Sequence, residues 1–292
     1  MLRALAASVA VGLSAPALGT YLVQRRLSLI GDGLGHVALT GVGVGLLLQG
    51  SPVIWAVIVA ALGAIAVELI RERGRTSGDI ALAILFYGGL AGGVVLIGLA
   101  HGNASLTSYL FGSPLSTTRA DLVVVWILAI AVLAVSLLLR PWLFAVCQDE
   151  EYARVAGLPV RALNLTVAVT AAVTVTVGMR SVGLLLVSAL MVVPVATTQQ
   201  LARGFRTTQH AAMLLGGLAA VIGIWLSAEL DTAPGATIVL TAIAGFLGVS
   251  VGVAAWRTVV RRRGRAALTA STTAGPAAGA PGAEPPEVVL NG

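Results

Sequence analysis

The sequence predicts an all-α fold, a polytopic membrane helix bundle of about nine transmembrane helices. Hydrophobic residues make up 58% of the 292 residues, charged residues make up 10%, and the mean hydropathy is +0.97. A soluble domain carries about 25% charged residues. The apolar residues also form continuous runs long enough to cross a bilayer, which takes roughly 20 residues in a helix. A membrane barrel would instead alternate apolar and polar residues in segments of about ten, so helices are favoured.

Apolar runs between polar breaks set the boundaries of the predicted helices. The sixth and seventh runs are separated by Met179-Arg180-Ser181 alone, which leaves open whether they are two full spans. The predicted spans cover residues 4–24, 28–48, 52–70, 79–100, 121–140, 162–179, 181–201, 209–229 and 235–256.

The basic residues predict the orientation of the bundle. All 18 are arginines, because the chain contains no lysine. With the N-terminus outside and the C-terminus in the cytoplasm, 15 of the 18 fall on the cytoplasmic side, and Arg3, Arg119 and Arg180 fall outside. Arginine and lysine concentrate in cytoplasmic loops, so this orientation is the predicted one.

Composition divides the chain into two parts. Residues 1–258 form the predicted transmembrane domain, and from Gly264 the composition changes to Ala, Pro, Gly, Thr and Glu. Such a segment cannot bury enough apolar surface to offset the entropy lost on ordering. We therefore expect residues 259–292 to be a disordered cytoplasmic tail.

Composition also excludes several classes of function. The net charge of +6 does not indicate nucleic-acid binding, because the arginines follow the loops of a membrane protein. A phosphate-binding loop of the G-x-x-x-x-G-K-[ST] type requires a lysine, so any ATP hydrolysis must occur on a partner subunit. Cys147 is the only cysteine, which excludes disulfides and thiolate metal clusters within one chain.

The second predicted span contains the clearest candidate metal site. Asp32 and His36 lie four residues apart, so a helix places both on one face, and a rise of about 1.5 Å per residue from Arg26 puts His36 near the bilayer midplane. Charged groups inside a bilayer mark functional positions, and a carboxylate with an imidazole suits divalent zinc, manganese or iron. Further ligands would come from other helices, water or a second copy of the chain. The alternative is an Asp–His hydrogen bond that only ties helices together.

A second candidate lies in the longest predicted cytoplasmic loop, residues 141–161. Asp149 suits an N-cap, the acids after it suit the positive end of a helix, and Gly157 with Pro159 forms a stop signal. The pattern predicts one short helix on the cytoplasmic face, either an ordinary interfacial helix or a docking site for a soluble partner. The segment consists of Asp149, Glu150, Glu151, Tyr152, Ala153, Arg154, Val155, Ala156 and Gly157.

Four stretches occur in a specific order and spacing: Arg25-Arg26-Leu27-Ser28-Leu29-Ile30-Gly31-Asp32 through His36, Asp79 through Phe86, Tyr109-Leu110-Phe111-Gly112, and Gly183 through Val187 with Pro194-Val195-Ala196-Thr197. Together they resemble the permease family of zinc and manganese ABC importers, and the resemblance covers residues 5–258. No single stretch would be as specific as the set.

This resemblance implies a function and a set of partners. The chain would be the permease subunit, not an enzyme, of an ATP-driven importer in the bacterial plasma membrane, with Asp32 and His36 coordinating the ion in transit. A second permease chain, expected to be an identical copy, would share the pathway, and two cytoplasmic ATPase subunits would dock on residues 149–157. An extracytoplasmic metal-binding protein would deliver the ion, and no cofactor is expected to be bound permanently. Manganese-type members often carry Pro where this chain has Thr40, which favours zinc over manganese or iron.

Three other classes of function fit the sequence less well. An ion-coupled transporter would need more intramembrane acids than Asp32, and inverted repeats. A permease for cobalamin or iron chelates would not need a pair of ligands for a bare ion. A membrane metalloprotease would need the His-Glu-x-x-His motif, which the three scattered histidines cannot supply.

Overall fold

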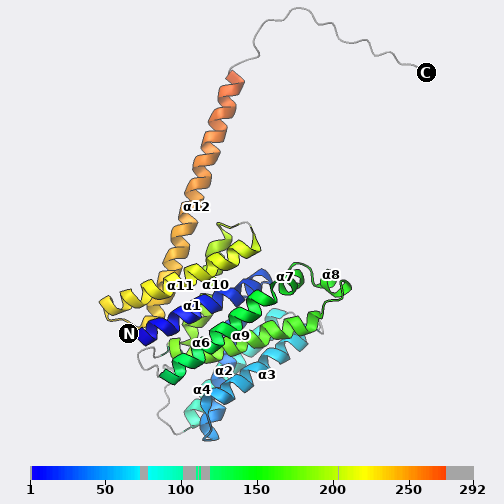
Figure 1. The fold of residues 1–292 in the computed structure, drawn as a ribbon, viewed down its shortest axis with the longest axis vertical. Coiled ribbons are helices and arrows are strands. Elements are labelled where there is room, and N and C mark those ends of the chain that lie inside the picture. Colours follow the sequence, from blue (N-terminus) through cyan, green and yellow to red (C-terminus); the bar gives the residue numbers. More distant parts are fainter. Residues whose placement is uncertain are drawn as a thin grey trace, which may run out of the picture. The chain divides into compact units, whose positions relative to one another are not determined.

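The computed structural model describes residues 2–72, 78–100, 110, 112, 119–202 and 204–273. Within these residues every regular element is an α-helix, and the chain forms two units, residues 1–249 and 250–292. The helices are α1 (Leu2–Gln24), α2 (Ile30–Leu47), α3 (Pro52–Glu72), α4 (Gly78–Leu99), α6 (Arg119–Leu138), α7 (Arg140–Gln148), α8 (Glu150–Val155), α9 (Val160–Val182), α10 (Leu184–Gln199), α11 (Phe205–Leu230) and α12 (Pro234–Thr273), as Figure 1 shows.

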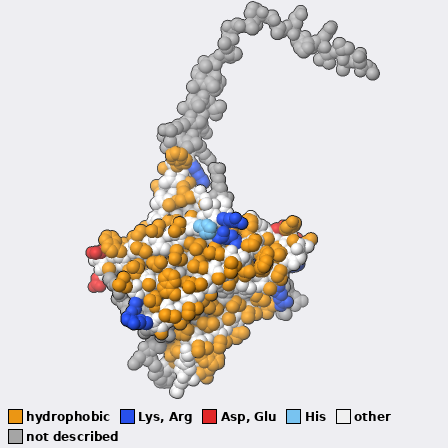
Figure 2. Space-filling view, viewed as in Figure 1, with side chains coloured by type: hydrophobic (Ala, Val, Ile, Leu, Met, Phe, Trp, Pro, Cys, Tyr) orange, Lys and Arg blue, Asp and Glu red, His pale blue; other side chains and the backbone are white. Residues whose placement is uncertain are grey.

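The prediction of a membrane helix bundle is confirmed. Eight of the described helices are long and apolar enough to span a bilayer, and α10 is apolar but has 16 residues. Large hydrophobic side chains such as Leu62, Ile84 and Ile127 are exposed on α3, α4 and α6. Figure 2 shows hydrophobic side chains over most of the visible face of the bundle. Lipid tails solvate such a surface, and the helices satisfy their own backbone groups.

Helices α1 and α2 form the centre of the first unit. In their apolar windows 78% and 72% of the residues are buried, more than in any other described span. Helix α1 packs against α6, α9, α10 and α11, and α2 packs against α3, α4, α9 and α10 (Figure 1). Tyr21 of α1 donates a hydrogen bond to the carbonyl oxygen of Ser136 in α6. Gln209 of α11 donates one of 2.9 Å to the carbonyl oxygen of Ala17, so polar contacts fix α1 from both sides.

Small residues let α2 and α4 approach closely. A Cβ on Gly89 of α4 would lie 2.6 Å from the backbone nitrogen of Val37, and one on Gly93 would lie 2.8 Å from the Cβ of Leu39. Glycine permits this approach because it has no side chain to separate the two backbones. The packing places α4 directly against the part of α2 that carries His36.

Helices α9 and α10 are two separate helices, and Gly183 divides them. The backbone of Gly183 has φ 93° and ψ 147°, a conformation that favours glycine. The sequence predicted the break at residues 179–181, but α9 continues through them to Val182. Gly112, with φ 71°, packs against this junction, because a Cβ there would collide with the backbone of Val182 and Gly183.

Two further differences from the prediction concern helix number and length. The cytoplasmic loop predicted to contain one helix contains α7 and α8, and Pro141 stands in the first turn of α7, where a proline is tolerated. Helix α12 continues to Thr273, into the range predicted as a disordered tail from residue 259. Residues 274–292 lie outside the described part of the chain.

Candidate functional site

Asp32 and His36 both lie in α2, one turn apart, as the sequence predicted. Asp32 stands in the first turn of the helix, and the Nε2 atom of His36 lies 3.8 Å from the Oδ1 atom of Asp32. This distance is too long for a hydrogen bond. The two polar groups therefore face the same space without bonding to each other.

The two side chains differ in their access to that space. His36 is buried, with 10% of its side chain exposed, whereas 29% of the side chain of Asp32 is exposed. The Nδ1 atom of His36 is buried and has no hydrogen-bond partner among the described residues. A neutral imidazole leaves one nitrogen free to accept a proton or a metal ion, so the pair combines an accessible carboxylate with an unsatisfied imidazole.

The predicted alternative, a tie between helices, lacks support. Among the described residues, neither Asp32 nor His36 forms a hydrogen bond to another helix. The imidazole is held instead by Phe86 of α4, whose ring meets it edge to face with 4.3 Å between centroids and 67° between planes. Nothing in the sequence pattern singled out Phe86 as a neighbour of His36.

Glycines orient the other faces of α2. A Cβ on Gly31 would lie 3.0 Å from the Sδ atom of Met191 in α10, and one on Gly35 would lie 3.0 Å from Val175 in α9. A Cβ on Gly33 would lie 3.1 Å from Leu82 in α4. Because these glycines let α10, α9 and α4 pack closely against α2, the packing fixes the rotation of α2 about its axis. This rotation determines the direction in which Asp32 and His36 point.

The donor set is incomplete for a buried metal ion. Zinc in proteins takes four ligands, and no group of three or more His, Cys, Asp or Glu side chains occurs among the described residues. One oxygen and one nitrogen donor are ligand types that suit divalent transition metals. Tyr109 and Phe111 of the stretch Tyr109-Leu110-Phe111-Gly112 lie outside the described residues.

The predicted coupling segment folds as a short helix with its own start and stop signals. The side chain of Asp149 accepts a hydrogen bond of 2.9 Å from the backbone N–H of Tyr152, so it is the N-cap of α8. At the other end of the helix, Gly157 has φ 82°. The backbone N–H of Gly157 donates to the carbonyl oxygen of Arg154 at 3.1 Å, and the N–H of Leu158 donates to the carbonyl oxygen of Ala153 at 3.0 Å. These two bonds form a Schellman motif.

The outer surface of α8 is apolar as well as charged. Tyr152 is 70% exposed and Val155 is 87% exposed, whereas Ala153 is fully buried. Exposed apolar side chains on a short helix outside the lipid-facing spans suit contact with a soluble protein. Sequence reasoning missed Arg25 and Asn164, the two residues that hold Glu150 of this helix.

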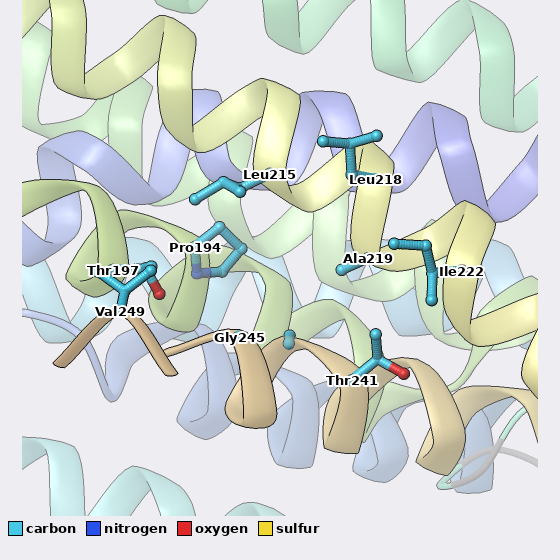
Figure 3. A pocket seen from close by; sticks show the side chains of 10 residues that line it. Pro194, Thr197, Leu215, Leu218, Ala219, Ile222, Thr241, Gly245 and Val249 are labelled. Atoms are coloured by element: carbon cyan, nitrogen blue, oxygen red, sulfur yellow. The ribbon is translucent and has the colours of Figure 1, made fainter. Parts of the chain in front are cut away.

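A separate pocket lies between α10, α11 and α12, within residues 194–249, and has a volume of 190 Å³ (Figure 3). Pro194 and Thr197 line it from α10, and Leu215, Leu218, Ala219 and Ile222 line it from α11. The hydroxyls of its two threonines, Thr197 and Thr241, already donate to carbonyl oxygens of their own helices at 2.7 and 2.8 Å. The lining is otherwise apolar and shares no residue with the Asp32–His36 pair, so it does not suit a cation.

Comparison with known proteins gives four findings. The family model described as "ABC 3 transport family" matches residues 1–252. The chain is 31% identical to the high-affinity zinc uptake system membrane protein ZnuB of Haemophilus influenzae, covering 81% of this chain and 91% of that one. It is also 31% identical to the manganese transport system membrane protein MntC of Halalkalibacterium halodurans, covering 82% of each chain. A chain of the solved structure of PsaBC from Streptococcus pneumoniae in complex with Fab superposes with a TM-score of 0.74 and 29% identity, covering 85% of this chain and 90% of that chain.

Proposed function

The chain belongs to the ABC 3 transport family, and from this premise we propose that it conducts zinc into the cytoplasm, with Asp32 and His36 as ligands of the ion in transit. The coarser function follows from the family. The chain is the multi-pass membrane permease subunit of a bacterial ABC importer for a divalent metal, and it is not itself an ATPase. The resemblance inferred from the sequence is therefore confirmed.

Family membership implies an ATPase and a binding protein as partners. We assign the ATPase contact to α8 and its caps, Asp149 to Gly157, because this helix exposes Tyr152 and Val155. We assign the missing metal ligands to water or to a second, identical permease chain, because the described residues supply only Asp32 and His36.

The observation that carries the proposal is the Asp32–His36 pair itself. It places a carboxylate and a buried imidazole without a hydrogen-bond partner 3.8 Å apart in one of the two most buried spans. A buried polar atom without a partner costs free energy, on the order of 1–3 kcal/mol. A passing ion held by Asp32 and by the Nε2 atom of His36, which lies near that carboxylate, would give this buried imidazole a partner.

The carboxylate of Asp32 suits zinc, manganese and iron alike. We favour zinc over manganese because the imidazole nitrogen of His36 suits zinc and iron, whereas manganese prefers oxygen donors. Relatives at 31% identity include one named for zinc and one named for manganese, so similarity alone does not separate them. Thr40 donates a hydrogen bond of 2.7 Å to the carbonyl oxygen of Gly89, so it positions α2 against α4.

The test is metal accumulation in cells that lack their own zinc importer. These cells would express the chain with its ATPase as wild type, Asp32→Ala or His36→Ala. We expect zinc uptake that requires the ATPase and that falls to background in both variants, with each variant still present in the membrane. Glu229→Ala and His210→Ala are matched controls, because both residues are exposed and the contact of His210 with Arg140 is exposed as well, and they should transport as wild type.

Two outcomes would contradict the proposal. Uptake that survives both Asp32→Ala and His36→Ala would place the pathway elsewhere. Accumulation of manganese or iron in preference to zinc, measured in the same cells with all three metals supplied together, would keep the permease function and replace the substrate.

A further inference from the structure

A polar cluster ties α8 to α9 and to Arg25, the residue directly after α1. Arg25, directly after α1, places its Nη2 atom 3.0 Å from the Oε2 atom of Glu150 in α8. Its Nη1 atom donates to the Oδ1 atom of Asn164 in α9 at 2.6 Å. The Nδ2 atom of Asn164 in turn donates to the Oε1 atom of Glu150 at 3.1 Å. The three side chains form a closed triangle in which both carboxylate oxygens of Glu150 accept.

The triangle is largely shielded from solvent. The side chain of Arg25 is 8% exposed, Asn164 is 4% exposed, and the side chain of Glu150 is 38% exposed. Arg71 of α3 and Arg154 of α8 approach the same carboxylate at 4.0 and 3.8 Å. Hydrogen bonds between ionised groups are stronger than neutral ones, and the side chain of Arg25 and Asn164 are buried while the side chain of Glu150 is partly exposed. The triangle is therefore a stronger connection than a fully exposed surface ion pair.

Helix α8 has few other attachments. Ala153 is the one buried residue among the six of this helix, whereas Glu151, Tyr152, Arg154 and Val155 are exposed. Glu150 is therefore the side chain through which α8 holds the bundle by polar contacts. A protein that pushes or pulls on α8 acts on Arg25 and Asn164 through this carboxylate.

Arg25 also lies close to the metal ligands along the chain. The connection between α1 and α2 is tightly wound, with backbone bonds from Leu27 to Leu22 at 2.8 Å and from Ile30 to Leu27 at 3.0 Å. Arg26 within it has φ 59°. Such a connection has little slack, so a displacement of Arg25 moves the first turn of α2, where Asp32 stands.

We propose that Glu150 is a positioning residue for transport: its carboxylate, held by Arg25 and Asn164, transmits movement of α8 to the Asp32 end of α2. The inference rests on the proposed function, since it requires an ATPase on α8 and an ion at Asp32. The ion pair of Arg25 and Glu150, which are more than a hundred residues apart in sequence, would then link nucleotide hydrolysis to the state of the metal site.

The experiment uses the full permease with its ATPase and binding protein in liposomes, and measures zinc uptake and ATP hydrolysis on the same sample. Glu150→Gln keeps the size of the side chain and removes its charge. We expect hydrolysis to continue near the wild-type rate while zinc moved per ATP falls about tenfold, the size of a typical coupling between two sites. Glu150→Asp, which keeps the carboxylate, should recover part of the ratio. Glu229→Gln, at an exposed glutamate of α11 outside the ATPase contact, is the control and should leave the ratio unchanged.

A second variant separates transmission from assembly. If Glu150→Gln fails to co-purify with the ATPase, Arg25→Gln tests the same ion pair from a side chain that is 8% exposed and so unavailable to the partner. The expected result is again ATP hydrolysis with little zinc transport. Loss of the assembled complex in both variants would show a purely structural pair and overturn the proposal, as would an unchanged ratio in Glu150→Gln. A wild-type complex that moves no zinc would instead reject the proposed function itself.

Discussion

Thr40 donates a hydrogen bond of 2.7 Å from its hydroxyl to the carbonyl oxygen of Gly89, and so fastens α2 to α4 one turn beyond His36. The bond crosses between two helices, whereas most threonine hydroxyls described in this chain donate to carbonyls of their own helices, as Thr166 does to Ala162. Interhelical polar contacts of this kind stabilise membrane bundles. The contact holds α2 against α4, the helix that carries Phe86.

Thr40→Val should therefore destabilise the permease in detergent by about 1 kcal/mol, because it removes an interhelical hydrogen bond at almost constant volume. Thermal unfolding of the purified chain measures the effect. Thr166→Val removes a bond within one helix and should shift the transition less. Equal shifts in the two variants would mean that the contact with Gly89 contributes nothing of its own.

Gly89→Ala should be more damaging than its size suggests. A Cβ at this position would lie 2.6 Å from the backbone nitrogen of Val37, so α2 must move away from α4 at a cost of about 1–3 kcal/mol. We expect a lower unfolding temperature and reduced zinc uptake. The neighbouring Gly88 has no atom within 4 Å of a built Cβ, and Gly88→Ala should be neutral or slightly stabilising. A harmless Gly89→Ala would show that α2 and α4 do not pack this closely.

Gly183→Ala tests the junction of α9 and α10. With φ at 93°, the backbone there adopts a conformation that costs a residue with a Cβ about 1–3 kcal/mol. We expect a loss of stability of this size in the same unfolding assay, compared with Gly98→Ala in open space on α4. Full stability of the Gly183 variant would indicate that the two helices join without this strained turn.

Cys147 should be a poorly reactive thiol. Burial raises its pKa to about 11, above the ordinary value of 9.0, and its Sγ atom lies 3.9 Å from the carbonyl oxygen of Tyr21. Because the thiolate is the nucleophile, iodoacetamide labelling at pH 8 should be about a hundredfold slower in the folded chain than in the unfolded chain. Mass spectrometry of the labelled protein measures the ratio, and similar rates in both states would contradict the burial.

The same shift sets the sign of a pH effect on stability. Below pH 9 the thiol is protonated in both states and contributes nothing. Between pH 9 and about 11 the unfolded chain releases the proton while the folded chain keeps it, so the free energy of unfolding falls as the pH rises. Cys147→Ser should remove this part of the alkaline loss, which unfolding measured across this range would show.

The sequence predicted the features that depend on neighbours along the chain. Apolar runs at 28–48 and 52–70 correspond to helices Ile30–Leu47 and Pro52–Glu72, because a spanning helix is a local pattern of known length. The Asp32–His36 pair was predictable for the same reason, since one helical turn joins the two residues. The cap at Asp149 and the stop at Gly157 are likewise local signals.

Features that depend on distant contacts or on backbone angles could not be read in this way. The break between α9 and α10 was predicted at residues 179–181, because hydropathy reflects the charge of Arg180. The break lies at Gly183, whose φ angle hydropathy does not reflect. The contact of Phe86 with His36 joins different helices and leaves no periodic trace. Asn164 was a visible signal, a polar residue in an apolar run, but its partners could be found only from the fold.

The self-contained caps of α8 have a consequence for engineering. Because Asp149 starts the helix and Gly157 ends it without help from the bundle, residues 149–157 could be grafted as a cassette into another importer to redirect it to a foreign ATPase. The acceptor would have to present a guanidinium and an amide where Arg25 and Asn164 stand. If α8 docks the ATPase as proposed, a graft without these two groups should still bind the ATPase, but the chimera should hydrolyse ATP without transporting metal.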